Sequence, residues 1–268
     1  ADYFDSPESA YNASEIELIS AGIHAETAKQ FLYFKEEFDV IAAEKAVKRA
    51  GLTLVTPSHP NYPQGLKTIF DPPQLLYVQG TLPKPSQPHL SVVGARKCSD
   101  YGRRNAERFA KEAAKAGIIV VSGLAYGIDS YAHHATLGTG TPTVAVLACG
   151  HDKITGRARH LAQQIIAEGG AIISEFPLKT PAFPFHHPIR NRIVSGMSRA
   201  TLVVEAAIKS GSLISARSAV DQNRDVLAIP GSIESPLSEG TNQLIKEGAL
   251  PITSEDELLA YYNVEPRT

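Results

Sequence analysis

Short runs of β-branched residues that alternate with helical segments constrain the fold of this chain more than any other feature. Residues 89–93 and 118–121 are two such runs, and each leads through a glycine-containing turn into a helical segment. Apolar runs of this length are typical of strands that are buried on both faces of a parallel sheet. Residues 91–129 therefore predict two consecutive strand–turn–helix units, with helices at 100–116 and from residue 128 to 138.

The same alternation continues to the end of the chain. Beyond residue 138 the sequence predicts strands at 142–148, 171–174, 201–205, 226–229 and 250–252, and helices at 157–168, 190–198, 212–223, 240–248 and 254–262. Two further strands are expected at 52–56 and 75–79, followed by a proline-rich link. This is the pattern of a doubly wound parallel sheet, so residues 52–268 predict one extended Rossmann-like α/β domain.

Residues 1–51 predict a small all-helical unit. Residues 1–13 are expected to form an extended or disordered lead. Ser14 then begins a helix, with Glu17 at the position that completes a capping box. Further short helices are expected at 26–34, 39–41 and 42–50, before Gly51 ends the unit. Its few apolar residues suffice for a small core only.

Composition excludes several classes of protein. The chain holds two cysteines, which match no metal-ligand spacing, and two free thiols are typical of a reducing, cytoplasmic setting. No apolar run approaches the roughly 18 residues of a membrane span, so we expect no membrane association and no metal or other cofactor. The formal net charge is −2. Its distribution is uneven, because residues 1–50 hold ten acidic against five basic side chains and leave the remainder slightly basic.

The carboxyl ends of the expected strands carry the features of an anion site. Parallel sheets of this kind bind ligands at that edge, where helix N-termini direct backbone N–H groups and a positive dipole at the ligand. The turn after residue 93 holds Gly94, Arg96 and Lys97. The next turn holds Ser122, Gly123 and Gly127. We therefore expect phosphate binding at this edge.

Two later segments add to the same edge. A small-residue helix start follows the strand at 201–205, and it consists of Lys209, Ser210, Gly211 and Ser212. The helix at 190–198 opens with Arg190, Asn191 and Arg192, whose guanidinium groups suit bidentate phosphate contacts. Glu205 could serve in catalysis as a lone carboxylate at a strand end, but we expect it to hold Arg190 or Arg192 in place. Asp129 is a helix-cap or general-base alternative.

No familiar catalytic motif accompanies this edge. The first turn lacks the second glycine of the dinucleotide fingerprint, and a P-loop is absent. The nucleophile elbow of serine hydrolases is absent as well. The two histidine pairs lack the spacing of a metal site. These absences leave the edge without a recognised catalytic motif.

A set of motifs, taken in order, resembles the DNA-processing protein A (DprA, also called Smf) family. The resemblance covers about residues 52–259. The motifs are T-P-S-H-P-N-Y-P-Q-G-L, F-D-P-P-Q-L-L-Y-V-Q-G, V-V-G-A-R, V-V-S-G-L-A-Y-G-I-D-S-Y-A-H, S-E-F-P-L, R-N-R-I-V-S-G-M-S-R, L-V-V-E-A, K-S-G-S-L-I-S-A-R-S-A, I-P-G-S and S-E-G-T-N-Q-L-I-K-E-G-A. Residues 1–51 resemble the family's sterile-alpha-motif-like N-terminal domain.

The resemblance implies a non-enzymatic protein that binds single-stranded DNA during natural transformation. It also implies protection of the strand, loading of the RecA recombinase and a homodimer. In the family, the arginine of the first turn contacts phosphate, and here that residue is Arg96. The resemblance carries the same basic pocket onto Ser122, Gly123, Gly127 and the 190–192 segment. It suggests Lys179 as a further DNA contact.

Three departures from the family pattern affect these expectations. The loop after residue 148 is shortened, which leaves Arg157, with Arg159, as its source of positive charge. His187 stands where the family usually has phenylalanine, so base stacking is expected at Phe183 or Phe185 instead. The family's C-terminal winged-helix-like domain is expected to be absent.

Two other functions remain open from the sequence. A related Rossmann group, the lysine-decarboxylase-like phosphoribohydrolases, would make the chain a nucleotide-binding enzyme, although its P-G-G-x-G-T motif is missing. A protein-interaction scaffold for RecA is the other alternative.

Overall fold

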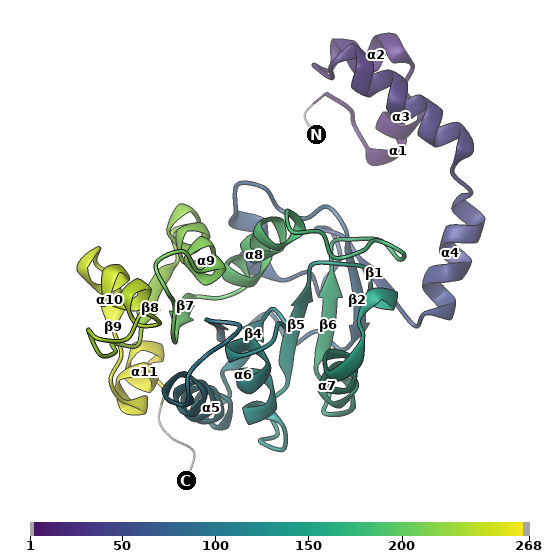
Figure 1. Cartoon of the computed structure of the whole chain (residues 1–268). Helices are drawn as coiled ribbons and strands as arrows, with labels where there is room; N and C mark the ends of the chain where they lie inside the picture. Colours follow the sequence, from purple (N-terminus) through teal and green to yellow (C-terminus); the bar gives the residue numbers. More distant parts are fainter. Residues whose placement is uncertain (1–2, 265–268) are drawn as a thin grey trace. The chain divides into compact units, whose positions relative to one another are not determined.

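The computed structural model describes residues 3–264 and divides the chain into two compact units, Ala1–Arg49 and Ala50–Thr268. The first unit is helical, with α1 (Pro7–Asn12), α2 (Glu15–Ser20), α3 (Ala25–Glu37) and α4 (Val40–Arg49) (Figure 1). Its small core is formed by Ala13, Leu18 and Ala28, against which Phe4, Ile23, Phe31 and Leu32 pack.

The expectation of an extended lead before residue 14 is wrong for α1. Ser6 and Ser9 form a reciprocal capping box around Pro7, which occupies the first turn of the helix. Proline is well suited to this position because its missing N–H would have no partner there. The predicted cap of α2 is confirmed, since Ser14 accepts from the Glu17 N–H and the Glu17 carboxylate accepts from the Ser14 N–H.

The second unit is built on a nine-stranded sheet, within the residues described, in the order β1-β2-β6-β5-β4-β3-β7-β8-β9. Its strands are β1 (Thr53–Val55), β2 (Leu76–Gly80), β3 (His89–Val93), β4 (Ile119–Ser122), β5 (Thr143–Leu147), β6 (Ala171–Ser174), β7 (Ala200–Val203), β8 (Asp225–Ala228) and β9 (Leu250–Pro251). Strands β3 to β9 pair in parallel, whereas β2 pairs antiparallel with both β6 and β1. The predicted α/β class is confirmed, with an antiparallel hairpin extending the sheet.

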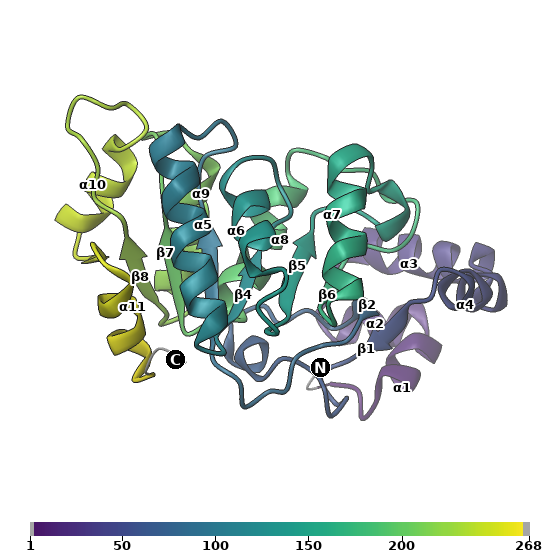
Figure 2. The same cartoon turned by 90° about the horizontal axis from the view of Figure 1, so that it is seen from below.

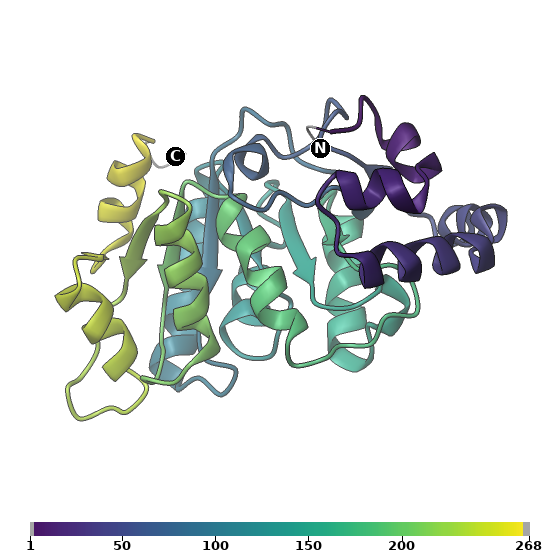
Figure 3. The same cartoon turned by 90° about the horizontal axis from the view of Figure 1, so that it is seen from above.

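Helices cover both faces of this sheet. One face carries α5 (Asp100–Lys115), α6 (Ile128–Thr136), α7 (Gly156–Ala167) and α11 (Glu255–Tyr262), most of which lie in front in Figure 2. The other carries α8 (His186–Gly196), α9 (Gly211–Asp221), α10 (Glu239–Lys246) and the short 3-10 helix η1 (Gln64–Thr68), as Figure 3 shows for α8 and α9.

Alternating residues of the strands pack into the hydrophobic cores on the two faces of the sheet. In β5, Val144 and Val146 pack toward α8 and α9, whereas Ala145 and Leu147 pack toward α7. All five residues of this strand are buried, which is why its sequence is a continuous apolar run. Each fully buried valine or leucine contributes roughly 1.5–3 kcal/mol relative to an exposed one.

Strand β3 marks the point where the winding direction reverses. Its neighbours are β4 on one side and β7 on the other. The helix after β3, α5, packs on one face of the sheet, and the helix after β7, α9, packs on the other. Because these two helices diverge, a crevice opens between the carboxyl ends of β3 and β7.

Candidate functional site

A pocket of about 500 Å³ occupies the crevice at the carboxyl ends of β3 and β7. The β3–α5 turn, the start of α6, the first turns of α8 and the start of α9 all contribute to its wall. It brings together sequence-predicted residues from four segments of the chain: Gly94, Arg96, Lys97, Gly123, Arg190, Asn191, Lys209, Ser210, Gly211 and Ser212. We call this the switch-point pocket.

Two glycines of the β4–α6 turn make close contacts that a side chain would block. A Cβ atom on Gly123 would collide with the guanidinium group of Arg190. Gly127 has a φ of +79°, and a Cβ there would meet the backbone oxygens of the β3–α5 turn. The missing side chains therefore let the β4–α6 turn lie against Arg190 of α8 and against the β3–α5 turn.

The exposed charge in the switch-point pocket is positive. Arg96 and Lys97 in the β3–α5 turn, and Lys209 before α9, are all exposed. Asp129 lines the same pocket but is buried, and its carboxylate accepts from the N–H groups of Gly123 (3.1 Å) and Ala125 (3.4 Å). Burial raises the pKa of Asp129, while the nearby Arg190 opposes that rise. A carboxylate engaged in this way fixes the turn and leaves the exposed cations uncompensated.

Arg190 forms part of the floor beneath these cations. Its side chain is buried, and Nη1 donates to the carbonyl oxygens of Gly123 and Val146. Its Nε lies buried without a hydrogen-bond partner. Arg190 therefore supplies positive potential to the pocket while its own hydrogen bonds tie α8 to β5 and the α6 turn.

A second pocket, of about 400 Å³, adjoins the first. The two share a wall formed by Arg96, Gly123, Ala125, His187 and Arg190. We call the second one the aromatic pocket, because Tyr126 and Tyr131 line it together with apolar residues of β5 and α7. Lys153 and Arg157 add exposed positive charge. The shortened loop therefore still brings Arg157 to the site.

Exposed aromatic rings stand near the shared wall. Tyr126 is 65% exposed, and Phe183 and Phe185 are also exposed. The rings of Phe183 and Phe185 stack at 5.4 Å with an interplanar angle of 6°. They flank residues that line the pockets, since Ala182 lines the aromatic pocket and His187 lines both. Flat exposed rings beside a cationic groove are suited to stack on nucleobases.

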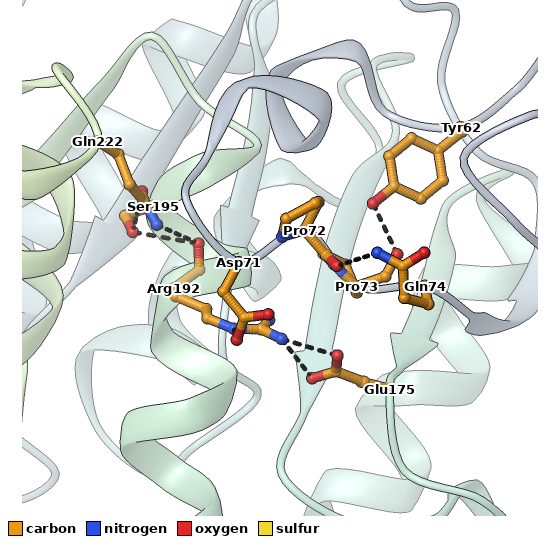
Figure 4. A network of polar contacts seen from close by, with 9 residues as sticks. All are labelled: Tyr62, Asp71, Pro72, Pro73, Gln74, Glu175, Arg192, Ser195 and Gln222. Carbon is orange, nitrogen blue, oxygen red and sulfur yellow. Dashed lines mark hydrogen bonds and ion pairs between the residues drawn. The ribbon is translucent and has the colours of Figure 1, made fainter. Parts of the chain in front are cut away.

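Arg192 lies apart from both pockets, contrary to the expectation that it closes their rim. It donates through Nε to Asp71 at 3.1 Å and through Nη2 to Glu175 at 2.7 Å (Figure 4). Its backbone carbonyl accepts from Gln222 at 2.9 Å. These contacts connect α8 with the loop before β2 and with the end of β6. We call them the Arg192 cluster.

The same region holds a buried tyrosine hydroxyl. Tyr62 donates to the Pro73 carbonyl oxygen at 2.8 Å, beside the Arg192 cluster in Figure 4. Burial raises the pKa of Tyr62 to about 12. The hydroxyl therefore stays protonated and holds the proline-rich loop at 71–74 in place.

Two other expectations, for Ser122 and Glu205, need correction, and the DNA contact of Lys179 stays a prediction. Ser122 is fully buried and donates to the Val92 carbonyl, so its side chain joins two strands and does not reach the pockets. Lys179 is exposed but lines neither pocket, and its backbone N–H donates to Asp152. Glu205 does not hold Arg190 or Arg192. It accepts from the N–H and hydroxyl of Ser99, at the N-terminus of α5.

Sequence reasoning missed several residues of the aromatic pocket: Tyr126, Tyr131, His134 and Lys153. Tyr126 could have been predicted, because it lies in the glycine-containing turn at 122–129 that the sequence analysis identified. Lys153 was not, since it lies in a 3-10 helix, η2 (His151–Lys153), of the altered loop. Within residues 3–264 no cluster of three His, Cys, Asp or Glu side chains could hold a metal ion. Over the same residues, no helix is long and apolar enough to cross a membrane.

Comparison with known proteins identifies the family. The model of the DNA recombination-mediator protein A family matches residues 53–263. The chain belongs to this family. Protein Smf of Escherichia coli K12 is 46% identical over 200 residues, which are 74% of this chain and 53% of that protein. The DNA processing protein DprA of Streptococcus pneumoniae is 40% identical over 75% of this chain and 71% of that protein.

Solved structures of the family share the fold. The X-ray structure of DprA from Streptococcus pneumoniae superposes with a TM-score of 0.79 at 35% identity, covering 87% of this chain and 81% of that chain. DprA from Helicobacter pylori, described for its single-stranded DNA binding mode, gives 0.70 at 28% identity, covering 79% and 95%. Family membership indicates a role in DNA processing. The chain spans about half the length of the Escherichia coli relative.

Proposed function

We propose that the switch-point and aromatic pockets bind single-stranded DNA without regard to its sequence. One observation carries the proposal: two adjoining pockets share the Arg96–Arg190 wall, and their exposed charges are cations, while the Asp129 carboxylate is buried and hydrogen-bonded. Phosphate contacts of this kind fix a strand in position and carry no sequence information.

Helix α9 adds a second source of positive potential. Its N-terminus, at Ser210 and Gly211, lines the switch-point pocket beside Lys209. The unpaired N–H groups of a helix N-terminus favour a phosphate. Arg96 follows β3 and Lys209 follows the neighbouring strand β7, and both line the same crevice, so each is assigned a phosphate of one backbone.

A single strand fits better than a duplex because the site also offers aromatic faces. Stacking on exposed rings such as Tyr126 and Phe185 requires bases that are not paired and stacked within a helix. Each stacked base contributes roughly 1–3 kcal/mol. The Helicobacter pylori relative, with its described single-stranded DNA binding mode, supports the same proposal.

Binding without catalysis is part of the proposal. The two buried carboxylates at this edge already have structural partners, since Asp129 holds the α6 turn and Glu205 caps α5. Neither is free to act as a general base or nucleophile. A phosphoribohydrolase activity would need a carboxylate that faces the bound ribose.

We further propose that the strand is handed to a recombinase of the RecA type and that the protein acts as a cytoplasmic homodimer during natural transformation. The description of the family as a recombination mediator supports the first point. A dimer would double the number of phosphate contacts through avidity. In that setting the protein would protect incoming DNA until RecA assembles on it.

Fluorescence anisotropy with labelled oligo-dT, beside a matched duplex, tests DNA binding across a salt series. We expect tighter binding of the single strand, with the logarithm of the affinity falling linearly with the logarithm of the salt concentration. Arg96→Ala should weaken binding about tenfold and reduce the salt slope by about 0.7. Arg104→Ala is the matched control, because Arg104 is exposed on α5 and lines neither pocket.

Two outcomes would replace this function by an alternative. Equal affinity for duplex, or no effect of Arg96→Ala, would contradict single-strand binding at this site. Release of ribose 5-phosphate from nucleoside monophosphates would favour the phosphoribohydrolase. A RecA complex that persists when Arg96 and Lys209 are both neutralised would favour a scaffold. Assembly of RecA on oligo-dT with and without the protein measures the loading step directly.

A further inference from the structure

His187 occupies the wall that separates the switch-point pocket from the aromatic pocket. The residue lines both pockets and is half-buried in the first turn of α8. Its Nδ1 is buried and has no hydrogen-bond partner. Nε2 is therefore the ring nitrogen available to a ligand that enters either pocket.

Two arginines and a second histidine lie close to this imidazole. On its own helix, Arg190 and His186 lie close to it, and Arg96 faces it from the β3–α5 turn. The other titratable or charged groups that line the two pockets are Lys97, Asp129 and Lys209 on one side of the wall, and Lys153, Arg157, His134, Tyr126, Tyr131 and Cys149 on the other. Of these, Asp129 alone carries a negative charge, and it is held in the α6 turn.

We propose that His187 takes up a proton when a phosphate of the strand reaches this wall, and then binds that phosphate as a cation through Nε2. The inference rests on the proposed function. It makes single-stranded DNA binding proton-linked, with an affinity that rises as the pH falls. A phenylalanine at this position, which the family resemblance leads one to expect, could stack but could not titrate.

The electrostatics of the free site explain why the proton arrives with the ligand. Burial, followed by Arg96, Arg190 and His186, lowers the pKa of His187 to about 4. The imidazole is therefore neutral in the free protein at neutral pH. A bound phosphate brings negative charge close to Arg96 and Arg190, which offsets their repulsion of an imidazolium, and it offers an acceptor to Nε2–H, so the pKa of His187 rises.

The sign of the pH effect follows from this rise. A group whose pKa is higher in the complex than in the free protein strengthens binding as the pH falls below the bound value. The affinity stops rising when the pH reaches the pKa of His187 in the free protein, which is about 4. With one proton taken up, the limiting slope is about tenfold in affinity per pH unit.

Anisotropy titrations of oligo-dT at pH 7.5, 6.5 and 5.5 and constant salt test the proposal. We expect the affinity of the wild type to rise at least threefold between pH 6.5 and 5.5, and that of His187→Phe to change much less. His160→Gln is the matched control, since His160 is an exposed histidine on α7 that lines neither pocket. Circular dichroism at pH 5.5 verifies that each protein is folded, and His187→Gln replaces the phenylalanine variant if that one is not.

NMR of ¹³C-labelled histidine, with and without oligo-dT, measures the pKa of His187 directly. The resonance of His187, assigned by its loss in His187→Phe, should titrate at a higher pH in the complex. Binding whose pH dependence is the same in wild type and His187→Phe, or a His187 pKa that the DNA leaves unchanged, overturns this inference alone. Absence of oligo-dT binding at every pH overturns the proposed function with it.

Discussion

Arg96 and Arg192 are both guanidinium groups near the carboxyl edge of one sheet, yet they have different roles. Arg96 is exposed, stands in the wall between two pockets, and has no carboxylate partner among residues 3–264. Arg192 is 16% exposed and pairs with both Asp71 and Glu175. The charge of Arg96 is available to a ligand, whereas that of Arg192 is paired with carboxylates of the protein itself.

This difference shows what makes an arginine a binding residue. A paired and half-buried guanidinium would have to give up two carboxylates before it could bind a phosphate, and the carboxylates would repel that phosphate. An exposed and unpaired one gives up only water. Arg190 shares features with both, because it is buried and hydrogen-bonded within the protein but lines the pockets like Arg96.

The largest effect is expected for Arg190→Ala. The change leaves the carbonyl oxygens of Gly123 and Val146 without their donor and leaves the buried Asp129 without a nearby cation. Removing one member of a buried charged network costs about 3 kcal/mol of unfolding free energy. Urea denaturation followed by circular dichroism measures it, with Arg104→Ala as the exposed control. A loss below about 1 kcal/mol would mean that Arg190 is chiefly a ligand contact.

A reciprocal pair of variants separates the two arginines. Arg192→Ala should lower the unfolding free energy by about 2 kcal/mol, because Glu175 loses its partner, and should change oligo-dT affinity less than twofold. Arg96→Ala should do the opposite, with a stability change within about 0.5 kcal/mol and a tenfold loss of affinity. Arg192→Lys should recover part of the stability.

The two arginines do not differ in role if Arg96→Ala and Arg192→Ala change oligo-dT affinity and stability alike. A fivefold loss of oligo-dT affinity in Arg192→Ala, measured at a temperature where that protein is fully folded, would return Arg192 to the DNA site. It would also show that the Arg192 cluster opens when DNA binds.

The same contrast explains which parts of the site the sequence could predict. Turns at strand ends follow from local patterns, so Gly94, Arg96 and Gly123 were assigned to one edge and the structure brings them together. Arg192 was misplaced because one partner, Asp71, lies 121 positions away and the other, Glu175, follows a different strand 17 positions away. Nothing near residue 192 reveals a partner that only the folded sheet supplies.

The fold shows a similar division. Strands such as β5 were predictable because burial on both faces produces a continuous apolar run. The antiparallel hairpin of β1 and β2 against β6 was not, since strand pairing is a long-range choice. α8 begins at His186, four residues before the prediction, because Pro188 is tolerated in a first helical turn. α1 was missed because serine, and not glutamate, completes its capping box.

A smaller effect is expected from the aromatic side of the site. Tyr126→Ala removes a 65% exposed ring from the aromatic pocket and should weaken oligo-dT binding about fivefold, which corresponds to one stacked base. Because no charge changes, the salt slope should stay the same, in contrast to Arg96→Ala. Tyr126→Phe should bind like the wild type. A loss of affinity in Tyr126→Phe as large as that in Tyr126→Ala would indicate that the hydroxyl, and not the ring, meets the strand.

The smallest effect is expected for Lys179, which the sequence placed in the site. Its φ of +71° lies in the left-handed region that favours glycine, and its side chain is exposed outside both pockets. Lys179→Gly should therefore leave oligo-dT affinity within twofold of the wild type and raise the unfolding free energy by at most about 0.5 kcal/mol. Arg157→Gly removes an exposed cation of the aromatic pocket, so at low salt it should weaken oligo-dT binding more than Lys179→Gly does. If instead Lys179→Gly lowers the affinity for oligo-dT fivefold, the strand must extend past the aromatic pocket along the 177–180 loop. An exposed and unpaired cation would then be a better indicator of a DNA contact than a position in one of the two pockets.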